Sequence, residues 1–79
     1  MNVKLFALAK QLAGRDEIRV ELQEGATIAD LRSSLAADYP ALAGLVPNMM
    51  MAVDARYATD DQPLDERAEI AAIPPVSGG

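Results

Sequence analysis

The residues best suited to chemistry are the last six of the chain, Pro74-Pro75-Val76-Ser77-Gly78-Gly79, whose reactive group is the terminal carboxylate. A C-terminal carboxylate is ionised at neutral pH, so it is a poor electrophile and needs activation, for example as an acyl-adenylate. Because glycine has no Cβ, Gly78 and Gly79 can pass through a narrow channel in another protein. The prolines stiffen the base of the segment, and its extended reach of about 20 Å is enough to enter a partner's buried pocket.

Side-chain chemistry is restricted because the sequence has neither cysteine nor histidine. Disulfides, thiolate nucleophiles, Ser-His and Cys-His catalysis, and zinc sites built on these residues are therefore excluded. We expect the chain itself to bind no cofactor and no metal, and Gly79 to carry its chemistry. A simpler alternative stays open, because most chain termini are disordered and a Gly-Gly ending can be inert.

The charge balance of the 79 residues is acidic, with seven Lys and Arg against twelve Asp and Glu and a net charge of −5. An acidic domain is repelled by nucleic-acid phosphates and by anionic membrane surfaces. We therefore expect no nucleic-acid partner and no membrane partner. The expected electrostatic partner is a basic protein surface, although solubility alone would also explain the charge.

The opening of the chain faintly resembles a secretory signal. Its apolar run over 5–9 ends at Lys10, which is too early for the roughly 7–15 apolar residues that such a signal needs. No stretch of the sequence is apolar for long enough to span a membrane. The sequence therefore predicts a cytoplasmic protein.

The elements that must position the tail are predicted from residue patterns. Alternation of apolar and other residues predicts strands over 2–7 and 17–23, and 8–13 predicts a short helical turn that Gly14 ends. The main helix is predicted to begin after Thr27, with Asp30 completing an approximate capping box, and Tyr39-Pro40 ends it. The remaining predicted elements are a helical turn at 41–46, strands at 49–53 and 68–73, and a short strand at 55–59.

The order strand, strand, helix and then two or three strands predicts an α+β chain with the β-grasp, or ubiquitin-like, fold. One main helix then covers one face of a mixed sheet of four to five strands. We expect a single domain over 1–79 with a flexible C-terminal tail at 74–79.

The second face of this sheet is predicted to carry an apolar patch, because one helix can cover only one face. The outward residues are expected to be Phe6, Met50, Ala52, Ala71 and Ile73. Such a patch is often a protein-binding surface, and methionine adapts well to a partner. The alternative is that Met50 and its neighbours fill an irregular core.

The chain resembles the small subunit of molybdopterin synthase, the MoaD type of sulfur carrier, over essentially its whole length. The matching segments are the opening 3–7, the helix end Leu12-Ala13-Gly14, Ala52-Val53, Pro63-Leu64, Glu69-Ile70 and the ending Pro-Pro-Val-Ser-Gly-Gly. Three segments depart from the family's usual residues and bear on partner contacts: Asp54 where Asn is common, Glu66-Arg67-Ala68 where Gly-Asp is common, and Ala71-Ala72-Ile73 where aromatic residues are common.

The resemblance implies a sulfur-transfer cycle that begins on Gly79. A ubiquitin-activating-type adenylyltransferase would use ATP and magnesium to adenylate Gly79, and a sulfur donor would convert the adenylate to a thiocarboxylate. Residues Pro74 to Gly78 would thread this group into the large subunit of the synthase, which receives sulfur for cyclic pyranopterin monophosphate and builds the molybdopterin dithiolene. The family complex is a heterotetramer, and the small subunit is not catalytic alone.

Three other functions fit the same pattern. A sulfur carrier for thiamin, cysteine or another product would share the fold, the tail and the activation step. A ubiquitin-like protein modifier would instead be joined to lysines through Gly79. A plain β-grasp binding module would have an inert tail.

Overall fold

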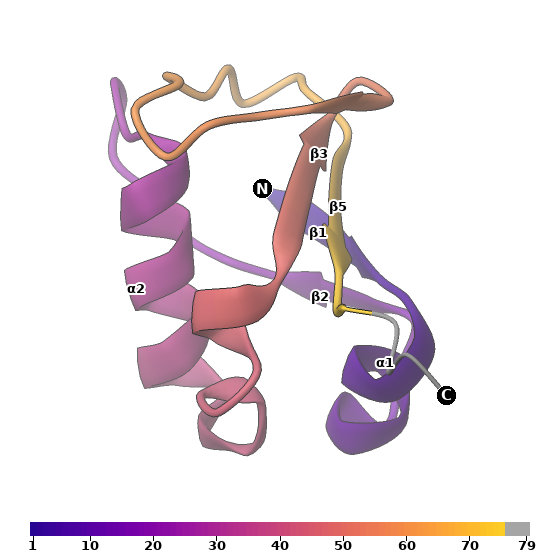
Figure 1. The fold of residues 1–79 in the computed structure, drawn as a ribbon. Coiled ribbons are helices and arrows are strands. Elements are labelled where there is room, and N and C mark those ends of the chain that lie inside the picture. The colour runs from indigo at the N-terminus through magenta and orange to yellow at the C-terminus, as the bar shows by residue number, and fades with distance from the viewer. Residues whose placement is uncertain (76–79) are drawn as a thin grey trace.

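The structure is a computed structural model that describes residues 1–75, and it is built on one mixed sheet (Figure 1). The five strands lie in the order β2-β1-β5-β3-β4. Their bounds are β1 Asn2–Leu5, β2 Glu17–Arg19, β3 Met50–Val53, β4 Arg56–Tyr57 and β5 Ile70–Ile73. The central strands β1 and β5 are parallel, and every other neighbouring pair is antiparallel. This arrangement confirms the predicted β-grasp fold.

Two α-helices and two short 3-10 helices complete the part of the chain that the structure describes. Their bounds are α1 Ala7–Ala13, α2 Ile28–Asp38, η1 Pro40–Leu42 and η2 Val46–Asn48. Helix α2 runs along one face of the sheet, whereas α1 lies at one end of it, in the connection between β1 and β2 (Figure 1). Within residues 1–75, no helix has both the length and the apolar character needed to cross a membrane.

The first strand is shorter than predicted because the backbone turns at Ala7. We expected alternation to continue to this residue, but β1 ends at Leu5 and Ala7 begins α1 with a left-handed φ of 53°. The predicted end of the helix is confirmed: Gly14 has a φ of 76° and donates its N–H to the carbonyl of Lys10 at 3.0 Å. A left-handed residue at this position favours glycine.

The second strand is also shorter than the predicted 17–23. It pairs with β1, and the ladder ends where Arg19 lies opposite Asn2, the first residue of β1. The last bonds join Val20 to Met1: the Val20 N–H donates to the Met1 carbonyl at 2.9 Å, and the Met1 ammonium donates to the Val20 carbonyl at 3.0 Å. Val20 is nevertheless buried and Leu22 half-buried, so the predicted apolar face is retained without the strand.

The predicted capping box of the main helix is confirmed. The Thr27 hydroxyl accepts a hydrogen bond from the Asp30 N–H at 3.4 Å, and the Asp30 carboxylate accepts from the Thr27 N–H at 2.9 Å. The helix ends at Asp38, with Tyr39 as its C-cap before Pro40, as predicted. Its apolar face then packs against the inner face of the sheet.

The core lies between α2 and the inner face of the sheet. Burial of each large aliphatic side chain stabilises the fold by roughly 1.5–3 kcal/mol. Among residues 1–75 no polar or charged side chain is buried. The core residues are Val3, Leu5, Ala9, Ile18, Val20, Ile28, Leu31, Leu35, Leu42, Val46, Met49, Met51, Val53, Ile70 and Ala72.

Candidate functional site

The face of the sheet that α2 leaves open is divided by charge. Residues directly opposite each other on neighbouring strands share a face. One row across the open face therefore runs from β2 to β4 through Glu17, Lys4, Ala71, Ala52 and Tyr57. The row is charged on β2 and β1 and carries apolar or aromatic side chains from β5 to β4.

A second apolar row lies nearer the end of β5. Met50 on β3 is directly opposite Ile73 on β5; Met50 is 48% exposed and Ile73 is half-buried. Phe6 follows Leu5, whose partner on β5 is Ala72, so Phe6 lies beside Ile73. Phe6 has extended backbone angles and is 46% exposed, so it points away from the core as the strand alternation requires.

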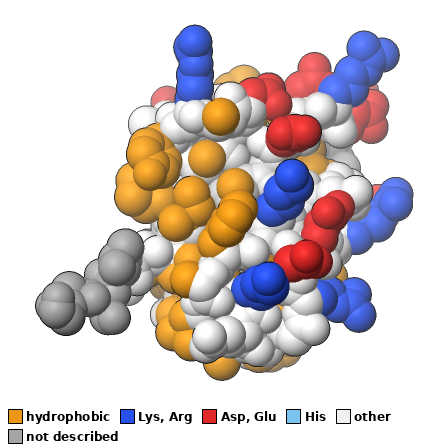
Figure 2. All heavy atoms as spheres, turned by 90° about the vertical axis from the view of Figure 1, so that its right-hand side faces the viewer, with side chains coloured by type: hydrophobic (Ala, Val, Ile, Leu, Met, Phe, Trp, Pro, Cys, Tyr) orange, Lys and Arg blue, Asp and Glu red, His pale blue; other side chains and the backbone are white. Residues whose placement is uncertain are grey.

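The second row and the part of the first row from β5 to β4 form one surface, which we call the apolar patch. Its members are Phe6, Met50, Ala52, Tyr57, Ala71 and Ile73. Figure 2 shows hydrophobic side chains gathered over one part of this side of the molecule and Lys, Arg, Asp and Glu over the other. The five residues expected from the sequence thus lie together, and the structure adds Tyr57.

Ala52 contributes little exposed area to the apolar patch. It is only 7% exposed, because Tyr57 and Ala71 lie directly opposite it on either side and shield its small side chain. The alternative that the methionines fill the core holds for Met49 and Met51, which are 2% and 1% exposed. Met50 instead faces solvent.

Sequence reasoning missed three exposed hydrophobic side chains. Tyr57 is 69% exposed, and Leu8 and Leu12 on α1 are about as exposed as Phe6. The signals were present: a strand after 49–53 places one of its residues opposite Ala52, and a spacing of four residues puts Leu8 and Leu12 on one face of a helix.

The start of the tail lies at the edge of the apolar patch. Pro74 and Pro75 directly follow Ile73; Pro74 is buried and Pro75 is exposed. The other predicted tail residues, Val76, Ser77, Gly78 and Gly79, lie outside the described residues. The described chain is therefore packed up to Pro74, at the edge of the apolar patch.

Two of the three departures from the family's usual residues lie away from the apolar patch. Asp54 is in the turn between β3 and β4, where its carboxylate accepts a hydrogen bond from the Glu69 N–H at 3.0 Å. The segment 66–68 forms a turn before β5, in which the Arg67 N–H donates to the Asp65 carboxylate at 2.8 Å. Only Ala71-Ala72-Ile73 contributes residues to the apolar patch.

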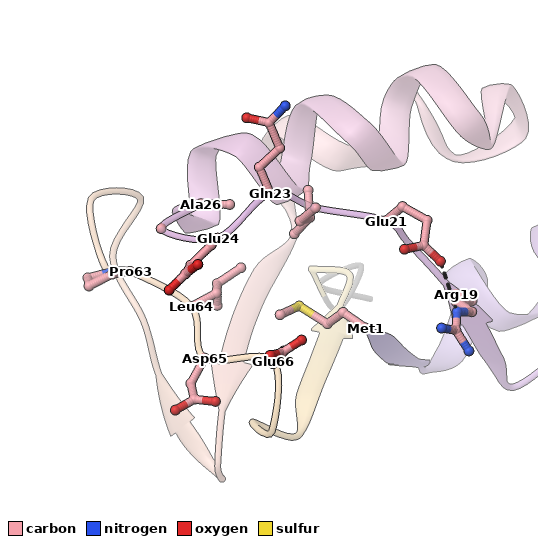
Figure 3. A pocket seen from close by; sticks show the side chains of 12 residues that line it. Met1, Arg19, Glu21, Gln23, Glu24, Ala26, Pro63, Leu64, Asp65 and Glu66 are labelled. Atoms are coloured by element: carbon pink, nitrogen blue, oxygen red, sulfur yellow. Dashed lines mark hydrogen bonds and ion pairs between the residues drawn. The ribbon is translucent and has the colours of Figure 1, made fainter.

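A hollow of about 710 Å³ lies at the end of the sheet opposite to the start of the tail (Figure 3). Glu21, Glu24, Asp65 and Glu66 contribute carboxylates to its lining, and Arg19 pairs with Glu21 at 3.1 Å. Arg19 is opposite Asn2, where β1 begins, whereas the tail starts beyond the other end of the parallel strand β5. The hollow and the start of the tail at Pro74 therefore lie at opposite ends of the sheet. Within residues 1–75, no group of three or more Asp and Glu side chains could hold a metal ion.

Known proteins resemble the chain over its full length. A model of the ThiS family matches residues 3–79. The molybdopterin synthase sulfur carrier subunit of Caenorhabditis briggsae is 41% identical, with 100% of this chain and 96% of that protein covered. The subunit of the same name from Arabidopsis thaliana is 32% identical, with 100% and 82% covered. The crystal structure of SAMP1, a small archaeal modifier protein from Haloferax volcanii, has a TM-score of 0.85 at 28% identity and covers 99% of this chain and 97% of that one.

Proposed function

The chain belongs to the ThiS family, and we propose that it is the sulfur carrier subunit of a molybdopterin synthase. The observation that carries the proposal is full-length identity of 41% and 32% to proteins with that name. The Gly78-Gly79 ending and the absence of cysteine agree with it, because a terminal thiocarboxylate needs no side chain to hold sulfur.

In the proposed cycle, the carboxylate of Gly79 is the only group of this chain that reacts. A ubiquitin-activating-type adenylyltransferase uses ATP and magnesium to form the acyl-adenylate and releases pyrophosphate. Sulfur at the oxidation level of hydrosulfide, released by a donor, attacks the carbonyl carbon, AMP leaves, and the terminal group becomes a thiocarboxylate with no change of oxidation state. The thiocarboxylate then supplies sulfur to cyclic pyranopterin monophosphate in the large subunit, and hydrolysis returns the carboxylate.

The apolar patch is the proposed docking surface for the large subunit. Met50 and Phe6 are each nearly half exposed, so a partner can remove substantial apolar area from water there. Ile73 belongs to the apolar patch and is followed directly by the tail, so docking brings the tail to the partner's catalytic pocket. The proposed assembly is a two-protein sulfurtransferase in which this chain is not catalytic alone.

Loss of the terminal glycine tests the proposal. In cells that lack their own carrier, the intact chain is expected to restore molybdopterin synthesis, whereas the chain without Gly79 is not. Glu24→Gln, in the hollow at the opposite end of the sheet, is the matched control and is expected to behave as the intact chain. Molybdopterin synthesis by the chain without Gly79 would contradict the proposal.

The likeness to SAMP1 favours protein modification as a second candidate function. In that case the activated Gly79 would form an amide with a lysine of another protein. Cell extracts would then contain higher-mass conjugates that react with an antibody to this chain. Those conjugates would vanish on deletion of Gly79, while molybdopterin synthesis would not depend on the chain.

A further inference from the structure

We propose that Met50 is a site of oxidation by peroxides, and that its conversion to the sulfoxide prevents the apolar patch from docking. The effect on docking rests on the proposed function. The selectivity of the oxidation rests only on the structure, because it depends on which thioether an oxidant can reach.

Three consecutive methionines differ sharply in exposure. Met49 and Met51 are 2% and 1% exposed, whereas Met50 between them is 48% exposed. The difference follows from the geometry of β3, in which Met51 points into the core and Met50 points to the open face. The chain thus contains two buried methionines beside one that solvent reaches.

Met50 is also the most exposed methionine of the chain. The sequence has no cysteine and four methionines. The fourth, Met1, is half-buried, and its ammonium group and carbonyl are both bonded to Val20. An oxidant therefore meets Met50 with no thiol of this chain competing for it.

The reaction is a two-electron oxidation that needs only a peroxide. The sulfur lone pair attacks one peroxide oxygen, the O–O bond breaks and an S–O bond forms. The peroxide is reduced to water, or to an alcohol if it is an organic peroxide, and Met50 becomes the sulfoxide. Methionine sulfoxide reductases reverse this modification, so the site can act as a switch.

The sulfoxide changes the centre of the apolar patch from apolar to polar. Met50 lies directly opposite Ile73, and Ala52 next to it on the same face offers only a methyl group. Neither side chain can donate a hydrogen bond to the sulfoxide oxygen. Burial of that oxygen without a partner is expected to weaken docking about tenfold or more. In the docked carrier, Met50 is covered and is expected to be protected.

The first experiment maps the oxidation of the full chain. The folded protein is titrated with hydrogen peroxide, and peptide mass spectrometry follows all four methionines. The first oxygen is expected on Met50, while Met49 and Met51 stay unmodified until the protein is unfolded by denaturant. Equal rates at Met49, Met50 and Met51, or faster oxidation of Met1, would overturn the proposal.

The second experiment measures binding to the purified large subunit before and after peroxide treatment. Oxidised wild-type chain is expected to bind at least about tenfold more weakly than reduced chain. The affinity of Met50→Leu, whatever its level, is expected to be the same before and after treatment. Unchanged binding by the oxidised wild type, or an equal loss in Met50→Leu, would overturn the docking effect. If the reduced wild type does not bind at all, the proposed function fails and the docking effect with it, but the oxidation map still decides whether Met50 is the modified site.

Discussion

Met50 and Ile73 lie directly opposite each other on the open face of the sheet, on strands β3 and β5. Ile73 is the last residue of β5, and the chain continues from it into the segment that ends at Gly79. A partner that binds the Met50 side chain therefore also holds the point where the tail begins. In the proposed function, docking at this pair would therefore position the start of the tail for delivery.

A charge at Met50 is expected to prevent docking without unfolding the protein. Met50→Glu places a carboxylate on a side chain that is 48% exposed, so the free energy of unfolding should change by no more than about 0.5 kcal/mol. Binding to the large subunit, measured by calorimetry, should weaken at least about tenfold because the carboxylate would be buried there. Glu17→Gln, on the charged part of the same face, is the control and should bind as wild type. A Met50→Glu chain that is unfolded would show that Met50 serves the core instead.

The turn between β3 and β4 is expected to be strained. Asp54 and Ala55 have φ values of 50° and 68°, a region that alanine adopts at a cost and glycine adopts freely. Ala55→Gly should therefore raise the free energy of unfolding by about 0.5–1 kcal/mol in urea titrations. Ala37→Gly, at an exposed helical position in α2, is the matched control and should lower it. A loss of stability in both variants would argue against strain in the turn.

The capping box of α2 is expected to contribute measurably to stability. Thr27→Ala removes the hydroxyl that accepts the Asp30 N–H, and should lower the free energy of unfolding by about 1 kcal/mol. Thr27→Ser keeps an acceptor and should retain most of that stability. Thermal melts of the three proteins check the order of stability. Wild type should be the most stable, followed by Thr27→Ser and then Thr27→Ala.

Arg32 is expected to matter more for stability than the exposed ion pair between Arg19, the last residue of β2, and Glu21. Its guanidinium donates to the Val46 carbonyl at 2.6 Å and to the Asp60 carboxylate at 2.8 Å, and its side chain is only 20% exposed. Arg32→Ala leaves the part-buried carbonyl without this donor and should cost about 1–3 kcal/mol of unfolding free energy. Arg19→Ala breaks a pair whose side chains are 72% and 83% exposed, and should cost no more than about 0.5 kcal/mol. Urea titrations that give equal losses would contradict this ranking.

Local signals made most of the fold predictable. Thr27 and Asp30 predict the start of α2, Gly14 predicts the end of α1, and Pro40 predicts the end of α2, because each acts through its own backbone neighbours. The predicted bounds are wrong where pairing with a residue far away in the sequence determines the end of a strand. Strand β2 ends at Arg19, opposite Asn2 at the first residue of β1, and the residue pattern of 17–23 does not reveal this register.

The apolar patch was predictable by alternation for Met50 and Ile73, but its extent was not. Tyr57 joins it because the register of β3 with β4 puts it opposite Ala52. Ala52 itself is shielded by the same pairing. Both facts depend on which strands are neighbours, which the sequence of any one strand does not specify.

If Gly79 carries sulfur as proposed, the mass of the intact chain will reveal it. The protein is produced together with its adenylyltransferase and a sulfur source, purified without reductant and analysed by mass spectrometry. We expect a species in which sulfur has replaced one terminal oxygen, and we expect it to be absent when the adenylyltransferase is omitted or Gly79 is deleted. A mass that stays that of the carboxylate in the presence of both partners would show that Gly79 does not carry sulfur.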